Sequence, residues 1–109
     1  MNTAWTPWKI LSATLGVGVL TEHWNLADLP PESTDKHRTF DVKVEFAAPF
    51  MSPPVVQIGL TGFDLDQRHG ARIAIAAKDI TVSGFTVQIS TWRETRVYSA
   101  EFTWMAIGA

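Results

Sequence analysis

The sequence predicts an all-β fold, a six-stranded antiparallel β-sandwich, and three observations support this prediction. Along several short segments, apolar and polar residues alternate with a period of two, as expected for strands with one buried face. Turn signals rich in glycine and proline separate these segments at short intervals. No segment carries the apolar stripe of an amphipathic helix. Short strands joined in this way favour two packed antiparallel sheets.

Length and composition limit the classes of function. The chain has 109 residues, which fits one domain. Its net charge of −2 argues against nucleic-acid binding, which requires a basic surface. The absence of cysteine excludes a disulfide framework and thiolate chemistry. Charged residues make up only 18% of the chain, a low share that indicates burial of part of the surface against a partner.

The N-terminal part is expected to form an extension, residues 1–13, ahead of a single domain, residues 14–109. Trp5 and Trp8 flank a proline, which keeps this stretch extended. Two tryptophans so close together are expected to dock on a sheet or on a neighbouring subunit rather than to remain in water.

The apolar run that follows, residues 10–20, is expected to contain the first strand, because Leu15, Val17 and Val19 alternate with other residues. The run lacks the cleavage site of a signal peptide and is too short to span a bilayer. We therefore expect no membrane insertion. The location of the protein stays open between the cytoplasm and secretion by a non-classical route.

The other strands follow from the same alternation, and proline-rich or glycine-containing turns separate them. We predict them at 41–46, 55–62, 72–77, 85–92 and from 97 to the C-terminus. In the fourth of the six strands, Arg72 interrupts an otherwise apolar segment, opposite Ile73 and Ile75.

Two connections are long and polar. Residues 23–36 form an irregular segment whose length predicts a functional role. Residues 63–70 carry two aspartates near His69, but without the fixed spacing of a metal loop. His23 and His37 lack partners at zinc-ligand spacing. We therefore predict neither a metal site nor a cofactor.

Three blocks of sequence, in this order and at these separations, resemble the H-type lectin family, which includes snail agglutinins and the C-terminal lectin domain of the discoidins. The resemblance covers roughly residues 15–109 and is dense from residue 40 onward. The blocks are FAAPF at 46–50 with PPVV at 53–56, GF at 84–85 with TW at 91–92, and TRVYS at 95–99 with WMAI at 104–107.

The resemblance implies a sandwich that assembles as a homotrimer and binds galactose or N-acetylgalactosamine in shallow sites at the protomer interfaces, without a metal. By position, the family's sugar-binding residues fall on Ser33, Asp35, Arg72, Trp92, Arg93 and Tyr98. Arg93 stands where the snail proteins have histidine, which leaves the preference between the two sugars open. The family's usual disulfide has no counterpart here, so a higher assembly of trimers would lack that covalent link.

The residue types suit this chemistry. An indole such as that of Trp92 packs against the face of galactose that is rich in C–H bonds. The Asp35 carboxylate accepts hydrogen bonds from two adjacent hydroxyls, while the Arg72 guanidinium donates a fork of N–H groups to neighbouring oxygens.

Each candidate also has a structural explanation. Trp92 suits a subunit interface, Arg72 an ion pair, and Asp35 an Asx turn. Tyr98 suits the core equally well, and Arg93 suits a solvated surface. Phe102 and Trp104, in contrast, are expected to lie in the core or on the trimer axis.

We therefore predict a carbohydrate-binding lectin, with a trimerising structural or adhesion module that lacks sugar binding as the alternative. Catalysis is disfavoured, because a glycosidase needs two carboxylates facing each other across the sugar, about 5–9 Å apart. Only Glu94 and Asp35 lie near the predicted site, and no Ser/His/Asp or Cys/His set exists.

Overall fold

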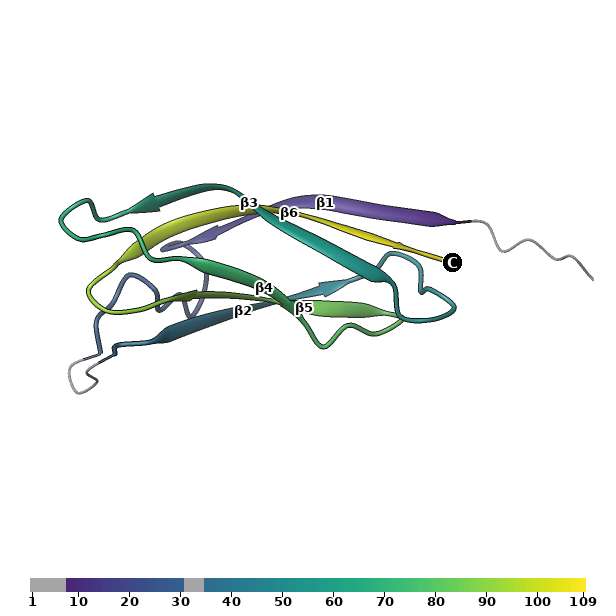
Figure 1. The fold of residues 1–109 in the computed structure, drawn as a ribbon, viewed down its shortest axis with the longest axis horizontal. Helices are drawn as coiled ribbons and strands as arrows, with labels where there is room; N and C mark the ends of the chain where they lie inside the picture. The colour runs from purple at the N-terminus through teal and green to yellow at the C-terminus, as the bar shows by residue number, and fades with distance from the viewer. Residues whose placement is uncertain (1–7, 31–34) are drawn as a thin grey trace, which may run out of the picture.

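The structure is a computed structural model that describes residues 8–30 and 35–109. Within these residues it contains six strands and no helix. The strands are β1 (Lys9–Gly18), β2 (Arg38–Glu45), β3 (Val55–Leu65), β4 (Ala74–Lys78), β5 (Gly84–Thr91) and β6 (Val97–Gly108). They form two antiparallel three-stranded sheets, ordered β1-β6-β3 and β2-β5-β4, which pack face to face (Figure 1). The predicted six-stranded antiparallel sandwich is confirmed.

The core lies between the sheets and follows the predicted alternation. Phe85, Val87 and Ile89 of β5 are buried, and so are Phe102 and Trp104 of β6. Each such side chain stabilises the fold by about 1.5–3 kcal/mol through burial. Since β5 and β6 are the central strands of their sheets, their inward residues meet at the middle of the sandwich.

An aromatic cluster joins the sheets at the end nearest the C-terminus. The ring centroid of Phe46 lies 5.0 Å from that of Phe50 and 5.8 Å from that of Trp104. Phe85 meets Trp104 edge-on at 5.5 Å. These are favourable distances for aromatic pairs. Trp104 is thus a core residue, as expected from the sequence.

The first strand begins earlier than predicted. β1 starts at Lys9, so residues 9–13, assigned to the extension from the sequence, belong to the sheet and pair with β6. The Lys9 ammonium donates to the carbonyls of Ala48 at 3.2 Å and Pro49 at 2.6 Å, which anchors the start of the strand. Trp8 is 77% exposed and does not dock on its own chain. Trp5 and the other residues of 1–7 lie outside the described part.

The boundaries of β3 and β4 also differ from the prediction. Residues 63–65, predicted as part of a polar loop, extend β3, because the long strand β6 offers them backbone partners as far as Val97. β4 begins at Ala74 rather than Arg72. Arg72 therefore lies in the connection before the strand and not within it.

The outer side of the β1-β6-β3 sheet combines open glycine backbone with exposed apolar side chains. Gly16 and Gly59 have no atom within 4 Å of the position that a Cβ would take. Between them the hydroxyls of Thr14 and Thr103 lie 3.0 Å apart. Ile107 pairs with Ile10 and Val55 on either side of it, and both of these side chains are exposed. We call this surface the small-residue face.

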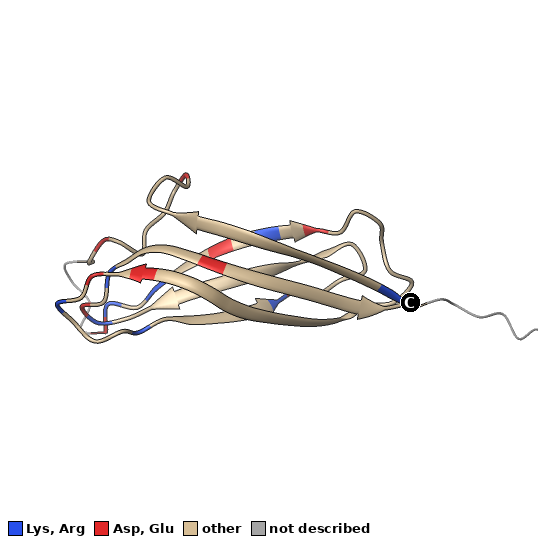
Figure 2. Ribbon diagram, turned by 90° about the horizontal axis from the view of Figure 1, so that it is seen from above, with Lys and Arg blue, Asp and Glu red and all other residues tan. Residues whose placement is uncertain are grey.

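Three connections gather at the end of the sandwich opposite the C-terminus: β1–β2, β3–β4 and β5–β6 (Figure 1). We call this the loop end. All five arginines of the chain lie in these connections or directly beside them. Figure 2 shows that Lys, Arg, Asp and Glu concentrate here, while the long strands carry few charges. The polar chemistry of the molecule is therefore concentrated at the loop end.

Candidate functional site

The β5–β6 turn, residues 92–96, is the centre of the loop end. β5 is the middle strand of its sheet, so the turn that follows it has neighbours on both sides. Arg38 of β2 pairs with Thr91, and Ala74 of β4 pairs with Ser90. The segments just before β2 and just before β4 therefore flank the turn.

Asp35 lies on the β2 side of the turn. Its carbonyl accepts a hydrogen bond of 2.7 Å from the backbone N–H of Arg93. The Asp35 side chain is exposed, and its carboxylate has no hydrogen-bond partner among the described residues. One chain alone thus brings this carboxylate next to the turn that carries Trp92 and Arg93. Ser33, two residues earlier, lies outside the described part of the chain.

Arg72 lies on the β4 side of the same turn. Its Nη1 donates to the Thr95 hydroxyl at 3.0 Å and to the Gly70 carbonyl at 3.4 Å. The Thr91 hydroxyl in turn donates to the Arg72 carbonyl. Within residues 8–30 and 35–109, no acidic side chain forms an ion pair with Arg72. Its guanidinium is held against the turn through Nη1, and its Nε and Nη2 form no hydrogen bond among the described residues.

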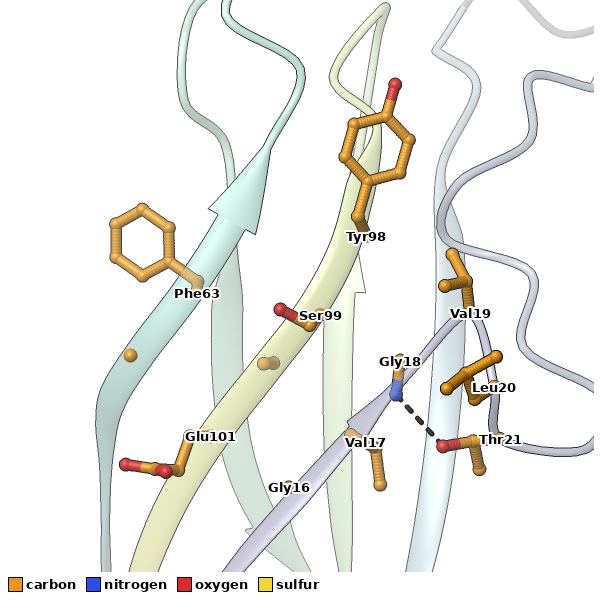
Figure 3. Close-up of a pocket in the computed structure, with 12 residues that line it drawn as sticks. Gly16, Val17, Gly18, Val19, Leu20, Thr21, Phe63, Tyr98, Ser99 and Glu101 are labelled. Atoms are coloured by element: carbon orange, nitrogen blue, oxygen red, sulfur yellow. Dashed lines mark hydrogen bonds between the residues drawn. The ribbon is translucent and has the colours of Figure 1, made fainter.

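Trp92 and Tyr98 belong to different sides of the molecule. Trp92 follows the buried Thr91, so the alternation of β5 directs it to the outer side of the β2-β5-β4 sheet, where it is partly buried. Tyr98, at the start of β6, lies on the outer side of the other sheet, near Phe63 (Figure 3). Its hydroxyl donates to the Asp66 carboxylate at 3.2 Å. Trp92 and Tyr98 therefore belong to two different sheets, although β5 and β6 are consecutive in the chain and a hairpin within one sheet would have brought them together.

The surface beside Tyr98 is a shallow groove of about 540 Å³ (Figure 3). Its floor is backbone, because Gly16, Gly18 and Gly62 present no side chains there. Phe63 forms one wall, and Leu20 and neighbouring residues form the other. The groove continues the small-residue face toward the loop end.

Asp66 is bound by side chains and backbone of its own chain. Its carboxylate accepts hydrogen bonds from the Arg68 backbone at 3.0 Å and from the Arg68 Nε at 2.9 Å, and it forms an ion pair with the same guanidinium. These bonds, with that from Tyr98, hold the pKa of the Asp66 carboxyl well below its usual range. Among the described residues, no three His, Asp or Glu side chains lie close enough to share a metal ion.

The low pKa of Asp66 predicts a specific pH dependence of stability. A carboxyl whose pKa is lower in the folded than in the unfolded state stabilises the fold above its unfolded value of about 4, and this stabilisation is lost as the pH falls toward the folded value. Between neutral pH and about pH 3, the urea midpoint of the wild type should therefore fall more than that of Asp66→Asn, whose amide does not titrate. Equal pH dependence in the two proteins would contradict the assignment.

An ion pair links the Asp35 segment to the turn. The Lys36 ammonium lies 2.8 Å from the Glu94 carboxylate. The hydrogen bond from Lys36 lowers the pKa of Glu94. Glu94 is one of the two acids near the predicted site. Because Lys36 pairs with it, this carboxylate is bound within the protein rather than directed at a ligand.

Arg38 was not predicted from the sequence as a residue of the site. This residue is only 6% exposed, and its guanidinium donates to five backbone carbonyls at the loop end. Burial lowers its pKa. A signal was available, because Arg38 has the same alternation phase as Val42 and Val44, which predicts a guanidinium on the buried face of β2.

The described part of the chain contains no helix able to span a membrane.

Comparison with known proteins agrees with the resemblance seen in the sequence. A recombinant discoidin II structure from Dictyostelium discoideum superposes with a TM-score of 0.76 at 21% identity, over 99% of this chain and 40% of that one. A wild-type discoidin II structure gives 0.76 and 21% over 98% and 39%. A protein of Fuscovulum blasticum named ATP synthase subunits region ORF 7 is 36% identical over 72 residues, which are 66% of this chain and 63% of that protein.

The chain thus spans less than two thirds of the length of each of these relatives. At 21% identity, the similarity to discoidin II establishes the fold. The family itself follows from a direct match, since the model of the H-type lectin domain fits residues 41–107, more than half of the sequence. The chain belongs to the H-type lectin domain family.

Proposed function

We propose that this domain is a non-enzymatic lectin that binds terminal galactose or N-acetylgalactosamine. The observation that carries the proposal is the bond between the Asp35 carbonyl and the Arg93 N–H, which sets an exposed carboxylate beside the turn bearing Trp92. Arg72 lies against the other side of the same turn. Membership of a carbohydrate-binding lectin family supports assigning this cluster to a sugar.

Each group has a distinct role in the proposed site. The Trp92 indole packs on the apolar face of the sugar ring. The Asp35 carboxylate accepts from two hydroxyls, and the Arg72 guanidinium donates to ring or hydroxyl oxygens. Arg93 adds a further polar contact, and the resemblance assigns another to Ser33. Removing either charged partner should cost on the order of 1.5–3 kcal/mol of binding free energy.

The sixth candidate, Tyr98, requires a second protomer. Trp92 and Tyr98 lie on the outer sides of two different sheets, and packed sheets are about 10 Å apart, so one sugar does not reach both within a chain. In a homotrimer, Tyr98 of one protomer approaches Trp92 of the next. The small-residue face favours such an assembly, because exposed Ile10 and Val55 beside bare glycine backbone form a flat apolar contact surface.

Assembly also supplies the affinity. A shallow site of this kind binds weakly, and a dissociation constant of about 1 mM corresponds to only about −4 kcal/mol. Three sites presented together raise the avidity for a glycan-coated surface by roughly 10² to 10⁴. The trimer is therefore the functional unit in this proposal.

The test combines a glycan array with sedimentation velocity on the wild-type protein. We expect a trimer in solution that retains glycans ending in galactose or N-acetylgalactosamine. A trimer that retains no glycan would support the alternative, a trimerising structural module. A monomer that binds neither sugar would refute both the assembly and the proposed site.

A further inference from the structure

We infer that Arg38 is a positioning residue, which holds the two loops of the sugar site in their binding conformation. That the ligand is a sugar rests on the proposed function. The positioning role itself is inferred from the hydrogen bonds of the buried Arg38 guanidinium.

The guanidinium of Arg38 joins two connections of the loop end, β1–β2 and β5–β6. Its Nη1 donates to the carbonyls of Asp28 at 2.8 Å and Leu26 at 3.4 Å in the β1–β2 connection. The same nitrogen donates to the Thr95 carbonyl at 2.9 Å in the β5–β6 turn. Backbone carbonyls, rather than a carboxylate, therefore satisfy this buried cation.

The other two nitrogens of the guanidinium, Nε and Nη2, bond to residues that directly follow candidate sugar contacts. Nε donates to the Lys36 carbonyl at 2.7 Å, and Nη2 donates to the Arg93 carbonyl at 2.7 Å. Lys36 directly follows Asp35, and Arg93 directly follows Trp92. One side chain thus fixes the backbone immediately after both of the principal candidate contacts.

Both of these residues have a left-handed backbone. The φ angle is 52° at Lys36 and 57° at Arg93. This conformation is unfavourable for residues with a side chain and persists only when the surroundings enforce it. The hydrogen bonds from Arg38 hold the backbone in this conformation at both positions. The hydrogen bond from the Arg93 N–H to the Asp35 carbonyl then joins the two segments.

The expected consequence is pre-organisation. If loss of Arg38 lowers the fraction of molecules with correctly placed loops to about one tenth, the apparent dissociation constant rises about tenfold, although no sugar contact has been removed. Lysine is not an adequate replacement, because its ammonium carries all of its donors on one nitrogen and does not reproduce the planar fork of the guanidinium.

The experiment compares Arg38→Lys with the wild type and with Val44→Ala. Val44 is a buried residue of β2 six positions along the strand, so its truncation destabilises the core without touching the loop end. Two quantities are measured for each protein: the affinity for galactose and N-acetylgalactosamine by NMR titration, and amide hydrogen exchange at Arg93 and at Ile89 in the core.

For Arg38→Lys we expect about a tenfold loss of affinity, faster exchange at the Arg93 amide, and retained protection at Ile89. Val44→Ala should keep both the affinity and the Arg93 protection. The inference is overturned if folded Arg38→Lys binds sugar within twofold of the wild type, or if Val44→Ala loses as much affinity.

A measurement on the wild type covers the case in which Arg38→Lys does not fold. The Arg38 Nε–H resonance should exchange slowly, and addition of either sugar should slow it further. Exchange of this proton at the rate of a solvent-exposed arginine would overturn the inference. If the wild type binds neither sugar, the proposed function is wrong, and so is the claim that Arg38 orders a sugar site. Exchange at the Arg93 amide in Arg38→Lys still decides whether Arg38 orders the β5–β6 turn.

Discussion

Replacement of Trp92 with alanine is expected to abolish detectable binding of galactose and N-acetylgalactosamine by the isolated domain. Truncating a tryptophan at the centre of a binding site commonly costs about 2 kcal/mol or more, which is roughly a thirtyfold loss of affinity. Applied to a site that binds in the millimolar range, this loss moves binding beyond the range of an NMR titration. The same titration, followed on the Arg93 amide, measures the effect.

Trp8 offers a matched control for this substitution. It is 77% exposed and lies just before β1, whose first residue pairs with Gly108 far from the loop end. Trp8→Ala should leave sugar affinity within twofold of the wild type. Trp92→Phe should keep part of the affinity, because a smaller ring still packs on the sugar. Wild-type affinity in Trp92→Ala would remove the indole from the proposed site.

The second large effect is on stability. Phe102→Ala is expected to reduce the free energy of unfolding by about 3–5 kcal/mol, as for other buried phenylalanine truncations. Phe102 is 0% exposed and lies on β6, the central strand of its sheet. Because a domain of this size has a total stability of only about 5–15 kcal/mol, much of the protein should unfold at moderate urea concentrations.

Met51→Ala is the control for Phe102→Ala. Met51 is also a large apolar residue, but it is 76% exposed in the β2–β3 connection. Its truncation should change the free energy of unfolding by no more than about 0.5 kcal/mol. Urea unfolding followed by tryptophan fluorescence measures both variants. A loss below about 1 kcal/mol in Phe102→Ala would mean that the core repacks around the missing ring.

The core was predictable from the sequence because its signal is local. The alternation of Phe85, Val87 and Ile89 with polar residues fixes which face of β5 is buried, whatever the partner strand. The same holds for Val56, Ile58 and Leu60 of β3, which pack against the core as expected.

Strand boundaries were less predictable because pairing decides them. Residues 9–13 and 63–65 are strands because β6 extends far enough to bond them, not because of their own composition. Periodicity within one segment carries no information about the length of its neighbour.

The residues of the proposed site could be named from the sequence, but the side chain that supports their backbone could not. The resemblance pointed to Asp35, Arg72 and Trp92, and the structure places their backbones at one turn. Arg38 is in phase with Val42 and Val44, but the strand predicted there began only at residue 41, so its inward position was missed. Its acceptors were not predictable, because they are main-chain carbonyls of irregular connections, and no residue type identifies them.

The position of β6 has a consequence for how the chain acquires its shape. β6 lies between β1 and β3, and every backbone bond of that sheet passes through it. Until residues 97–108 have emerged during synthesis, β1 and β3 are unpaired edges with exposed apolar side chains, which are prone to self-association. The β1-β6-β3 sheet therefore forms only after β6 has been synthesised. A translation product that ends before β6 should aggregate rather than persist as a partial domain.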